Sequence, residues 1–536
     1  MGATRNAFEL QAAIGAAARA SGHPVLDAGR GQPNWTVTAP RAAFFRLGEC
    51  AVGMAGRSSA LLDPDPYWGV VPAADGVARR LAQELADDPG PGGRFLTAAV
   101  EWAEEHLRFD PDAWVAELVR GVLGAGYPSP NRILRHVERV VEAYLVDMTG
   151  LEPGPPGRYR VFATEGGAAA MAYLFRTLQE NRLLRRGDRI AIATPIFSPY
   201  LEIPVLEDFG FDVVELRSAH NVGHRFDEHV LDGLRDPTIK AFFVVNPGNP
   251  DSRAIRPERL AQLRELVLGD RPDLLVVADT AYATFVEGFR SILAELPRNV
   301  ILVHSFSKNF GATGNRLGFL AVGDDTVVDN LLAAQDEVDR EAARRRYSSL
   351  TSDVGSLSFV QRLVADSREV ALHNITGLAT PDQVQMALFA LAHLMPDGAT
   401  HRAAVRGELA ARHDALLAPL AVAPPGGSDA QYYALVDLAG AVTARHGVAA
   451  MEAVAERADP ADVPMRLARD HGVVVMPGAG FGGMTWDVRV CLAALSRDEL
   501  ATVGAALATV VDALADDARR AAGMTRRRST TARGHR

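Results

Sequence analysis

The chain has 536 residues, 48% of them hydrophobic and 23% charged, with a formal net charge of −10 at pH 7. It is too long for a single hydrophobic core, and its acidic balance argues against nucleic acid as a general partner. With only Cys50 and Cys491, and no apolar run of the ~18 residues that a membrane helix needs, we expect a cytoplasmic protein without a disulfide framework or a membrane segment.

Breaks in the sequence pattern divide the chain into five parts. We expect, in order, an N-terminal arm with part of a small domain, a helical insertion, a large ligand-binding domain, a C-terminal small domain and a disordered basic tail, over residues 1–75, 76–125, 126–395, 396–520 and 521–536. Within the large domain, short apolar strands alternate with helical stretches from about residue 158 to 330, which predicts the α/β class.

The helical insertion contains three amphipathic stretches. We expect helices over Val77–Ala86, Phe95–Leu107 and Asp112–Leu123. Asp112 stands at the start of the third stretch, where its side chain can cap the helix N-terminus.

An anion site is predicted at the start of the large domain. The apolar run Val161–Ala163 is followed by Gly166 and Gly167, which open a helix that continues to Leu178. The free N–H groups at such a helix start bind phosphate well. Glu165 would repel a phosphate there, so we expect its side chain to point away.

Two later strands deliver polar residues at their carboxyl ends, where open α/β sheets bind ligands. Ala241–Val245 is followed by Asn246, and Leu274–Ala278 is followed by Asp279 and Tyr282. Asp279 can keep a pyridine nitrogen protonated, which makes the ring an electron sink. Asn246 and Tyr282 can donate hydrogen bonds to a phenolic oxygen on the same ring.

The most informative segment runs from His304 to Gly318. Lys308 lies among small residues, including Ser305 and Ser307, and Arg316 follows eight positions later. This layout suits a lysine that forms a Schiff base with pyridoxal 5′-phosphate, while the serines and the arginine fork hold the phosphate. Taken alone, the segment could also be a surface loop with a solvated lysine; the strand-end residues before it favour the cofactor site.

The order of these motifs resembles the aspartate aminotransferase fold type of pyridoxal-phosphate enzymes, over roughly residues 5–515. The resemblance implies a large domain with a mostly parallel seven-stranded sheet between helices, and a smaller α/β domain. Four further stretches look like the alanine-forming aspartate 4-decarboxylase branch of that family: residues 27–35, 40–48, 359–368 and 377–386. Asn315 is a departure, because the family usually has tryptophan before the phosphate arginine.

The resemblance also implies several site residues. Tyr127 resembles the tyrosine that reaches the phosphate in a neighbouring subunit, and Phe197 resembles the aromatic residue that stacks on the pyridine ring. Arg30 resembles the decarboxylase arginine near the substrate's distal carboxylate. Arg489 lies in an alternating strand pattern and needs a partner, which could be a substrate α-carboxylate or an internal acid. For Tyr127 and Phe197, ordinary packing remains the competing interpretation.

These residues predict a carboxy-lyase that converts L-aspartate to L-alanine and CO2, with secondary aspartate aminotransferase activity and no metal. The alternatives are an aminotransferase that acts on aspartate or another acidic amino acid without decarboxylation, and a non-catalytic sensor of the cofactor. A close analogue such as cysteine sulfinate would fit the same arginine. The family also implies a homo-oligomer built from dimers.

Overall fold

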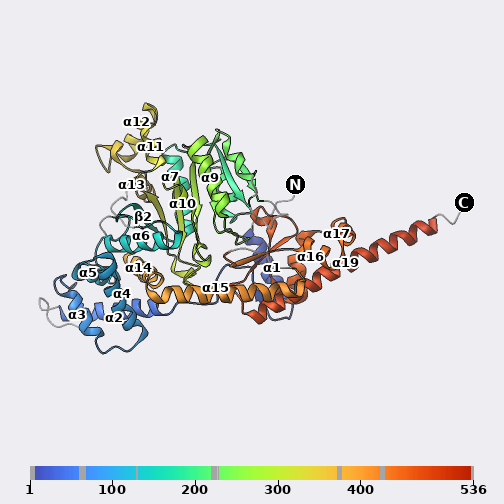
Figure 1. The fold of residues 1–536 in the computed structure, drawn as a ribbon, viewed down its shortest axis with the longest axis horizontal. Helices are drawn as coiled ribbons and strands as arrows, with labels where there is room; N and C mark the ends of the chain where they lie inside the picture. The colour runs from blue at the N-terminus through green and yellow to red at the C-terminus, as the bar shows by residue number, and fades with distance from the viewer. Residues whose placement is uncertain are drawn as a thin grey trace.

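The computed structural model describes residues 7–58, 68–127, 131–218, 226, 229–370, 377–422 and 429–532, and the side chains among them from residue 9 to residue 521. A seven-stranded sheet lies at the centre, helices α2 to α5 (residues 39–57 and 77–122) gather at one end, and α16, α17 and α19 (residues 438–455 and 497–532) lie at the other end together with α1 (residues 7–20) (Figure 1). No helix in these ranges is long and apolar enough to cross a membrane.

The central sheet has the strand order β2-β8-β7-β6-β5-β3-β4. Only β8 runs antiparallel to its two neighbours, so the prediction of a mostly parallel seven-stranded sheet is confirmed. Its strands are β2 Tyr159–Thr164, β3 Arg189–Thr194, β4 Asp212–Arg217, β5 Ile239–Val245, β6 Leu275–Asp279, β7 Val300–Ser305 and β8 Gly318–Gly323. Strands β6 to β8 are almost wholly buried, as expected for near-continuous apolar runs with both faces covered.

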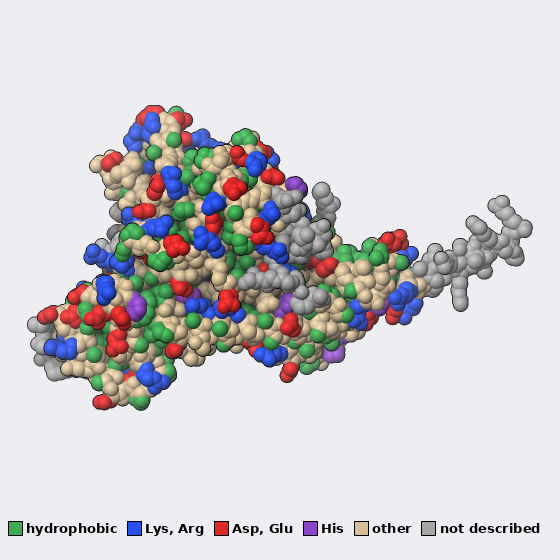
Figure 2. Space-filling model, viewed as in Figure 1, with side chains coloured by type: hydrophobic (Ala, Val, Ile, Leu, Met, Phe, Trp, Pro, Cys, Tyr) green, Lys and Arg blue, Asp and Glu red, His purple; other side chains and the backbone are tan. Residues whose placement is uncertain are grey.

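Helices cover this sheet and connect its strands. The helix α7 packs against β7 and β8, and α6 packs against β2. The helices of the first two thirds of the chain are α1 Ala7–Ala20, α2 Ala39–Arg57, α3 Val77–Leu85, α4 Pro91–Leu107, α5 Pro111–Val122, α6 Arg135–Thr149, α7 Gly167–Glu180, α8 Pro199–Glu202, α9 Pro257–Asp270, α10 Ile292–Glu295, α11 Val327–Ala333 and α12 Glu337–Tyr347. On the face shown in Figure 2, acidic and basic side chains are interspersed, as is typical of a solvated surface.

The three helices expected in the helical insertion are present as α3, α4 and α5, but α4 begins at Pro91 and not at Phe95, and the predicted N-cap of α5 is wrong. The N-cap of α5 is Asp110, whose side chain accepts a hydrogen bond from the backbone N–H of Ala113. Asp112 lies inside the first turn, and its carboxylate instead accepts hydrogen bonds from the N–H groups of Gly76 and Ala78, at 2.7 and 2.9 Å. It therefore stabilises the start of α3, because Pro111 moves the start of α5 one residue earlier than expected.

The C-terminal part builds a second, smaller α/β unit, which also contains α1 and β1 from the N-terminal arm. Its three-stranded antiparallel sheet has the order β11-β12-β9, with β9 Tyr433–Asp437, β11 Met476–Pro477 and β12 Asp487–Cys491. The N-terminal strand β1 Leu26–Asp27 pairs with β10 Val473–Val474.

The helices of the last third of the chain are α13 Phe359–Asp366, α14 Thr380–Leu394, α15 Pro396–Leu417, α16 Leu438–His446, α17 Val448–Ala455, α18 Val463–His471 and α19 Arg497–Ala532.

Long-range pairing thus explains why α1 and β1 belong with the C-terminal unit, whereas α2, from the same predicted N-terminal arm, packs against α4, α5 and α14. The proposed boundaries at residues 75, 125, 395 and 520 stay predictions. Helix α19 continues to Ala532, and residues 533–536 of the predicted basic tail lie outside the described residues.

Candidate active site

A cavity of about 510 Å³ opens at the carboxyl ends of β5, β6 and β7, between the central sheet and the C-terminal unit. The sequence placed its candidate residues at the same strand ends. The predicted site residues that line the cavity are Arg30, Gly167, Phe197, Asp279, Tyr282, Ser305, Ser307, Lys308, Arg316 and Arg489. One cavity therefore collects residues that are up to 459 positions apart in the chain (489 − 30).

The residues predicted to form a phosphate cradle, Gly166 and Gly167, lie beside Arg316 and Ser305. Gly166 has a φ of +91°, and a Cβ added there would lie 2.5 Å from Nη2 of Arg316, so only glycine allows this approach. Gly167 begins α7 opposite Ser305, whose hydroxyl donates to Oγ of Ser307 at 2.9 Å. Free N–H groups, two hydroxyls and a guanidinium thus surround one small space, which fits a phosphate.

Lys308 and Asp279 face the same cavity. The Lys308 ammonium donates to the backbone oxygen of Gly31 at 2.6 Å. Burial raises the pKa of Asp279 to about 6, while hydrogen bonds from the Ala281 N–H and the Tyr200 hydroxyl and the charge of Lys308 oppose the shift. A buried carboxyl of this kind, without a direct cationic partner among the described residues, can hold a proton shared with a ring nitrogen.

Asn246 offers a direct test of whether these residues fit the cofactor. Its side chain is 1% exposed, and its Oδ1 accepts a hydrogen bond from the N–H of Ile255 at 2.9 Å. Its Nδ2 is buried and has no partner among the described residues. Buried amide donors are normally satisfied, so this donor points to a missing acceptor such as a phenolic oxygen. Asn246 itself does not line the cavity, but it directly follows Val245, which does.

Arg489 is held firmly on β12. It is 6% exposed, with Nη1 donating to Oδ1 of Asn249 at 3.1 Å and Nη2 donating to the backbone oxygen of Gly29 at 2.6 Å. Its guanidinium lies 4.4 Å from the ring centre of Phe481 and 4.5 Å from that of Tyr433. The sequence left open that Arg489 pairs with an acidic side chain of the chain itself. No such partner is found among the described residues, so the positive charge of Arg489 remains available to a substrate carboxylate.

Besides Asn246, two predicted residues stand apart from the cavity lining, and Arg30 lines it without fixed contacts. Tyr127 is 79% exposed and precedes residues 128–130, which lie outside the described residues, so its role toward a neighbouring subunit stays a prediction. Gly166 lies behind Gly167 and meets the site through Arg316. Arg30 lines the cavity and makes no hydrogen bond or ion pair to another described residue.

Sequence reasoning missed three residues that complete the site. Tyr200 donates to Asp279 at 3.2 Å, and Asn249 and Tyr433 contact the hydroxyl of Tyr282 at 3.4 and 3.2 Å. Tyr200 and Asn249 stand in strand-end stretches that the sequence does single out. No sequence signal marked Tyr433, because β9 reaches the cavity only through the pairing of the C-terminal sheet.

For two histidines near these motifs, His304 and His373, the sequence favours a packing role over acid–base catalysis. Burial lowers the pKa of His304 to about 3, and its ring contacts the Tyr144 hydroxyl at 2.9 Å and the Thr280 backbone oxygen at 3.1 Å, behind the cavity. His373 lies outside the described residues. Asn315, the departure noted above, donates to Oε1 of Gln385 at 2.6 Å, so a hydrogen bond fixes the position that a tryptophan usually fills.

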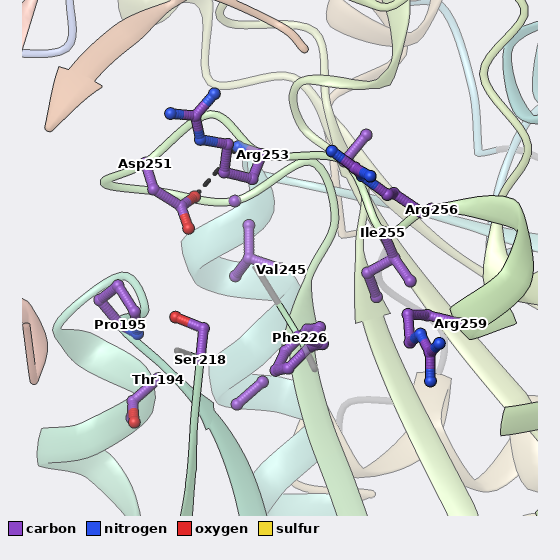
Figure 3. Close-up of a pocket in the computed structure, with 13 residues that line it drawn as sticks. Thr194, Pro195, Ser218, Phe226, Val245, Asp251, Arg253, Ile255, Arg256 and Arg259 are labelled. Atoms are coloured by element: carbon purple, nitrogen blue, oxygen red, sulfur yellow. Dashed lines mark hydrogen bonds between the residues drawn. The ribbon is translucent and has the colours of Figure 1, made fainter. Parts of the chain in front are cut away.

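A second, smaller cavity of about 30 Å³ adjoins the first and shares Val245 with it (Figure 3). Asp251 points into it and accepts a hydrogen bond from the Arg253 N–H at 3.1 Å, and burial raises the pKa of Asp251 to about 7. The Arg253 guanidinium pairs instead with Asp429 at 2.6 Å. This space has room for about two water molecules.

Comparison with known proteins gives a consistent result. The family model for aminotransferase class I and II matches residues 157–507. A bifunctional aspartate aminotransferase and L-aspartate beta-decarboxylase from Pseudomonas sp is 39% identical over 492 residues, which cover 91% of this chain and 92% of the relative. A valine–pyruvate aminotransferase from Mycobacterium tuberculosis is 33% identical over 139 residues, which cover 25% of this chain and 34% of the relative.

Solved structures of similar shape include a double mutant of Thermus thermophilus aspartate aminotransferase, with a TM-score of 0.60 and 18% identity, covering 95% of this chain and 97% of that one. The aromatic aminotransferase from Pyrococcus horikoshii has a TM-score of 0.55 and 17% identity, and the match covers 91% of this chain and 96% of that one. At these identities the likeness shows the fold.

Proposed function

The chain belongs to the class I and II aminotransferase family, and on that basis we propose that it is a pyridoxal-phosphate enzyme that converts L-aspartate to L-alanine and CO2, with side aspartate aminotransferase activity. One observation carries the choice of a dicarboxylic substrate. Arg489 and Arg30 line the same cavity as Lys308, and neither has a carboxylate partner among the described residues. Two available guanidinium groups suit a substrate with two carboxylates.

Residues from five strand ends would hold the cofactor. The cradle at Gly166 and Gly167 would take the phosphate together with Ser305, Ser307 and Arg316. Asn246 and Tyr282 would donate to the phenolic oxygen, Phe197 would pack on the ring, and Asp279 would hold a proton at the pyridine nitrogen. When bound, pyridoxal phosphate supplies an electron sink conjugated with the substrate's α-carbon, which both loss of the β-carboxylate and amino transfer require.

The side chains then divide the remaining work. Arg489 fixes the substrate's α-carboxylate, and its many contacts set the orientation of the α-carbon. Lys308 would bind the cofactor aldehyde, and its free amine would act as the general base that takes and returns the substrate's α-proton. Arg30 holds the distal carboxylate, and the firmness of that contact sets the balance between decarboxylation and amino transfer.

The test is to mix the purified, cofactor-loaded protein with L-aspartate alone and to follow CO2, alanine and the absorption spectrum together. We expect sustained release of CO2 and alanine in equal amounts, and no turnover by Lys308→Ala. A single burst of oxaloacetate, with turnover only after a keto acid is added, would make the protein an aminotransferase without decarboxylation. A spectrum that does not respond to aspartate would contradict the substrate assignment.

We also propose a cytoplasmic location and a homo-oligomer built from dimers. The low cysteine count supports the first. The exposed Tyr127 supports the second, because the side chain lies outside the cavity of its own chain and is free to reach that of a neighbour. Measuring the mass of the protein in solution tests the assembly.

A further inference from the structure

Glu165 is an acidic residue in the loop that forms the predicted phosphate cradle. It directly precedes Gly166, the residue against which Arg316 packs. The Tyr173 hydroxyl, from the second turn of α7, donates to Oε2 of Glu165 at 3.1 Å, which ties the cradle loop to the helix. Glu165 does not line the cavity, but the loop that should bind a phosphate dianion carries its negative charge.

A buried arginine, Arg368, lies near the end of β2, the strand that leads into this loop. Arg368 follows α13 and is only 5% exposed. Its Nη2 donates to the backbone oxygen of Asn131 at 2.7 Å, while Nε and Nη1 are buried without a hydrogen-bond partner among the described residues. A buried guanidinium that uses only part of its donors is unusual, because charged groups are rarely buried without being paired and hydrogen-bonded.

Arg368 lies against the end of β2, the strand that leads into Glu165. A Cβ added to Gly377 would lie 3.6 Å from Nη2 of Arg368 and 3.8 Å from the backbone oxygen of Ala163, so the guanidinium and the strand end share one small space. Burial lowers the pKa of Arg368, and the nearby charge of Glu165 opposes that shift. The two side chains thus interact through charge and not through a direct ion pair.

We propose that Arg368 is a positioning residue that offsets the charge of Glu165, so that the cradle at Gly166 and Gly167 binds the cofactor phosphate tightly. This inference rests on the proposed function, since it concerns the phosphate of pyridoxal phosphate. Arg368 does not line the cavity and touches neither cofactor nor substrate. The rival explanation is that Arg368 only anchors the backbone at Asn131.

The experiment measures the dissociation constants of pyridoxal phosphate and of pyridoxal, which lacks the phosphate, with the apoenzyme. Arg368→Met is expected to weaken binding of pyridoxal phosphate about tenfold or more, because an uncompensated carboxylate then repels the phosphate through a medium of low effective dielectric. Binding of pyridoxal should change less than about twofold, since the ring and aldehyde carry no such charge. Equal weakening of both ligands would overturn the proposal.

Three further variants separate charge from anchoring. Arg368→Lys keeps the charge but not the fork, so it should bind pyridoxal phosphate much better than Arg368→Met. Glu165→Gln should tighten binding, and in that background Arg368→Met should lose most of its effect, because the charge it offsets is gone. Additive effects of the two substitutions, or a lysine variant no better than methionine, would leave anchoring as the explanation.

The matched control is Arg176→Met, which removes a positive charge from α7 at a partly exposed site where Arg176 pairs with Glu369 at 2.8 Å. It should leave both dissociation constants unchanged. If Arg368→Met does not fold, Glu165→Gln and Arg368→Lys still decide the matter, since tighter binding by the first and retained binding by the second are both required. Failure of the wild-type protein to bind pyridoxal phosphate through Lys308 would instead overturn the proposed function.

Discussion

Replacing Arg489 by leucine should remove the contact to the substrate's α-carboxylate and leave the other groups of the proposed site in place. An arginine has five N–H donors, and Arg489 uses one for Asn249 and one for Gly29, which leaves three (5 − 2) without a partner among the described residues. A substrate carboxylate can engage two of them. With about 1.5–3 kcal/mol for each charge-assisted hydrogen bond, the loss is about 3–6 kcal/mol.

This magnitude sets the expected kinetics. At about 1.4 kcal/mol per tenfold change, the lower half of that range corresponds to a fall in kcat/KM for aspartate of about 10²- to 10³-fold. We favour the lower half because the substitution also releases Asn249 and the Gly29 carbonyl, which can then bind water or substrate. Arg489→Lys should fall between the wild type and Arg489→Leu, since lysine keeps the charge but not the planar fork.

The assay compares a ligand that has two carboxylates with one that has a single carboxylate. Titrating the cofactor spectrum with aspartate and with alanine should show that Arg489→Leu weakens both ligands. Arg30→Leu is the matched control: it should weaken aspartate and leave alanine within about twofold, because alanine has no distal carboxylate. If Arg489→Leu bound alanine as well as the wild type does, the assignment of Arg489 to the α-carboxylate would be wrong.

Buried carboxyls and helix caps give further tests. Burial raises the pKa of Asp279 to about 6 and that of Asp251 to about 7, so the folded apoenzyme keeps protons that the unfolded chain releases above about pH 4. The free energy of unfolding of the apoenzyme should therefore fall as the pH rises toward these values. Asp279→Asn should remove the pH dependence that ends at about pH 6, and Asp251→Asn should remove the pH dependence that extends to about pH 7. Urea unfolding midpoints measured across this pH range would show both effects. Asp110→Ala and Asp112→Ala should each cost about 1 kcal/mol in the same measurement, because each carboxylate caps a helix start. An Asp112→Ala protein as stable as the wild type would show that its hydrogen bonds to α3 contribute nothing.

The sequence predicted the chemistry at strand ends better than the contacts between distant segments. Roles for Asn246, Asp279 and Lys308 could be predicted because each lies at or within three residues of the end of a buried strand, and the carboxyl ends of parallel strands meet at one edge of the sheet. The environment of Arg489 could not be read in this way. Its two rings and two acceptors come from four separate segments, and only the folded chain brings them together.

The same reasoning explains the error at Asp112. A carboxylate near a helix start usually caps its own helix, and Asp112 was therefore the predicted N-cap. Pro111 makes Asp110 the cap instead, because proline is favoured at the first helical position and the cap is the residue directly before it. Asp112 is then left to bind α3, a contact that depends on how two helices pack and not on local sequence.

The two arginines of the cavity differ in a way that bears on the balance of activities. Arg489 is buried, stacked between two aromatic rings and hydrogen-bonded on both terminal nitrogens, so in the proposed role it would hold the α-carboxylate in one orientation. Arg30 is exposed and makes no contact of that kind with another described residue, so the distal carboxylate has room to pivot about the fixed end. Loss of CO2 requires the bond to the β-carboxylate to leave the plane of the conjugated system, which a rigid clamp at both ends would oppose. One firm and one loose arginine therefore suit decarboxylation better than amino transfer alone.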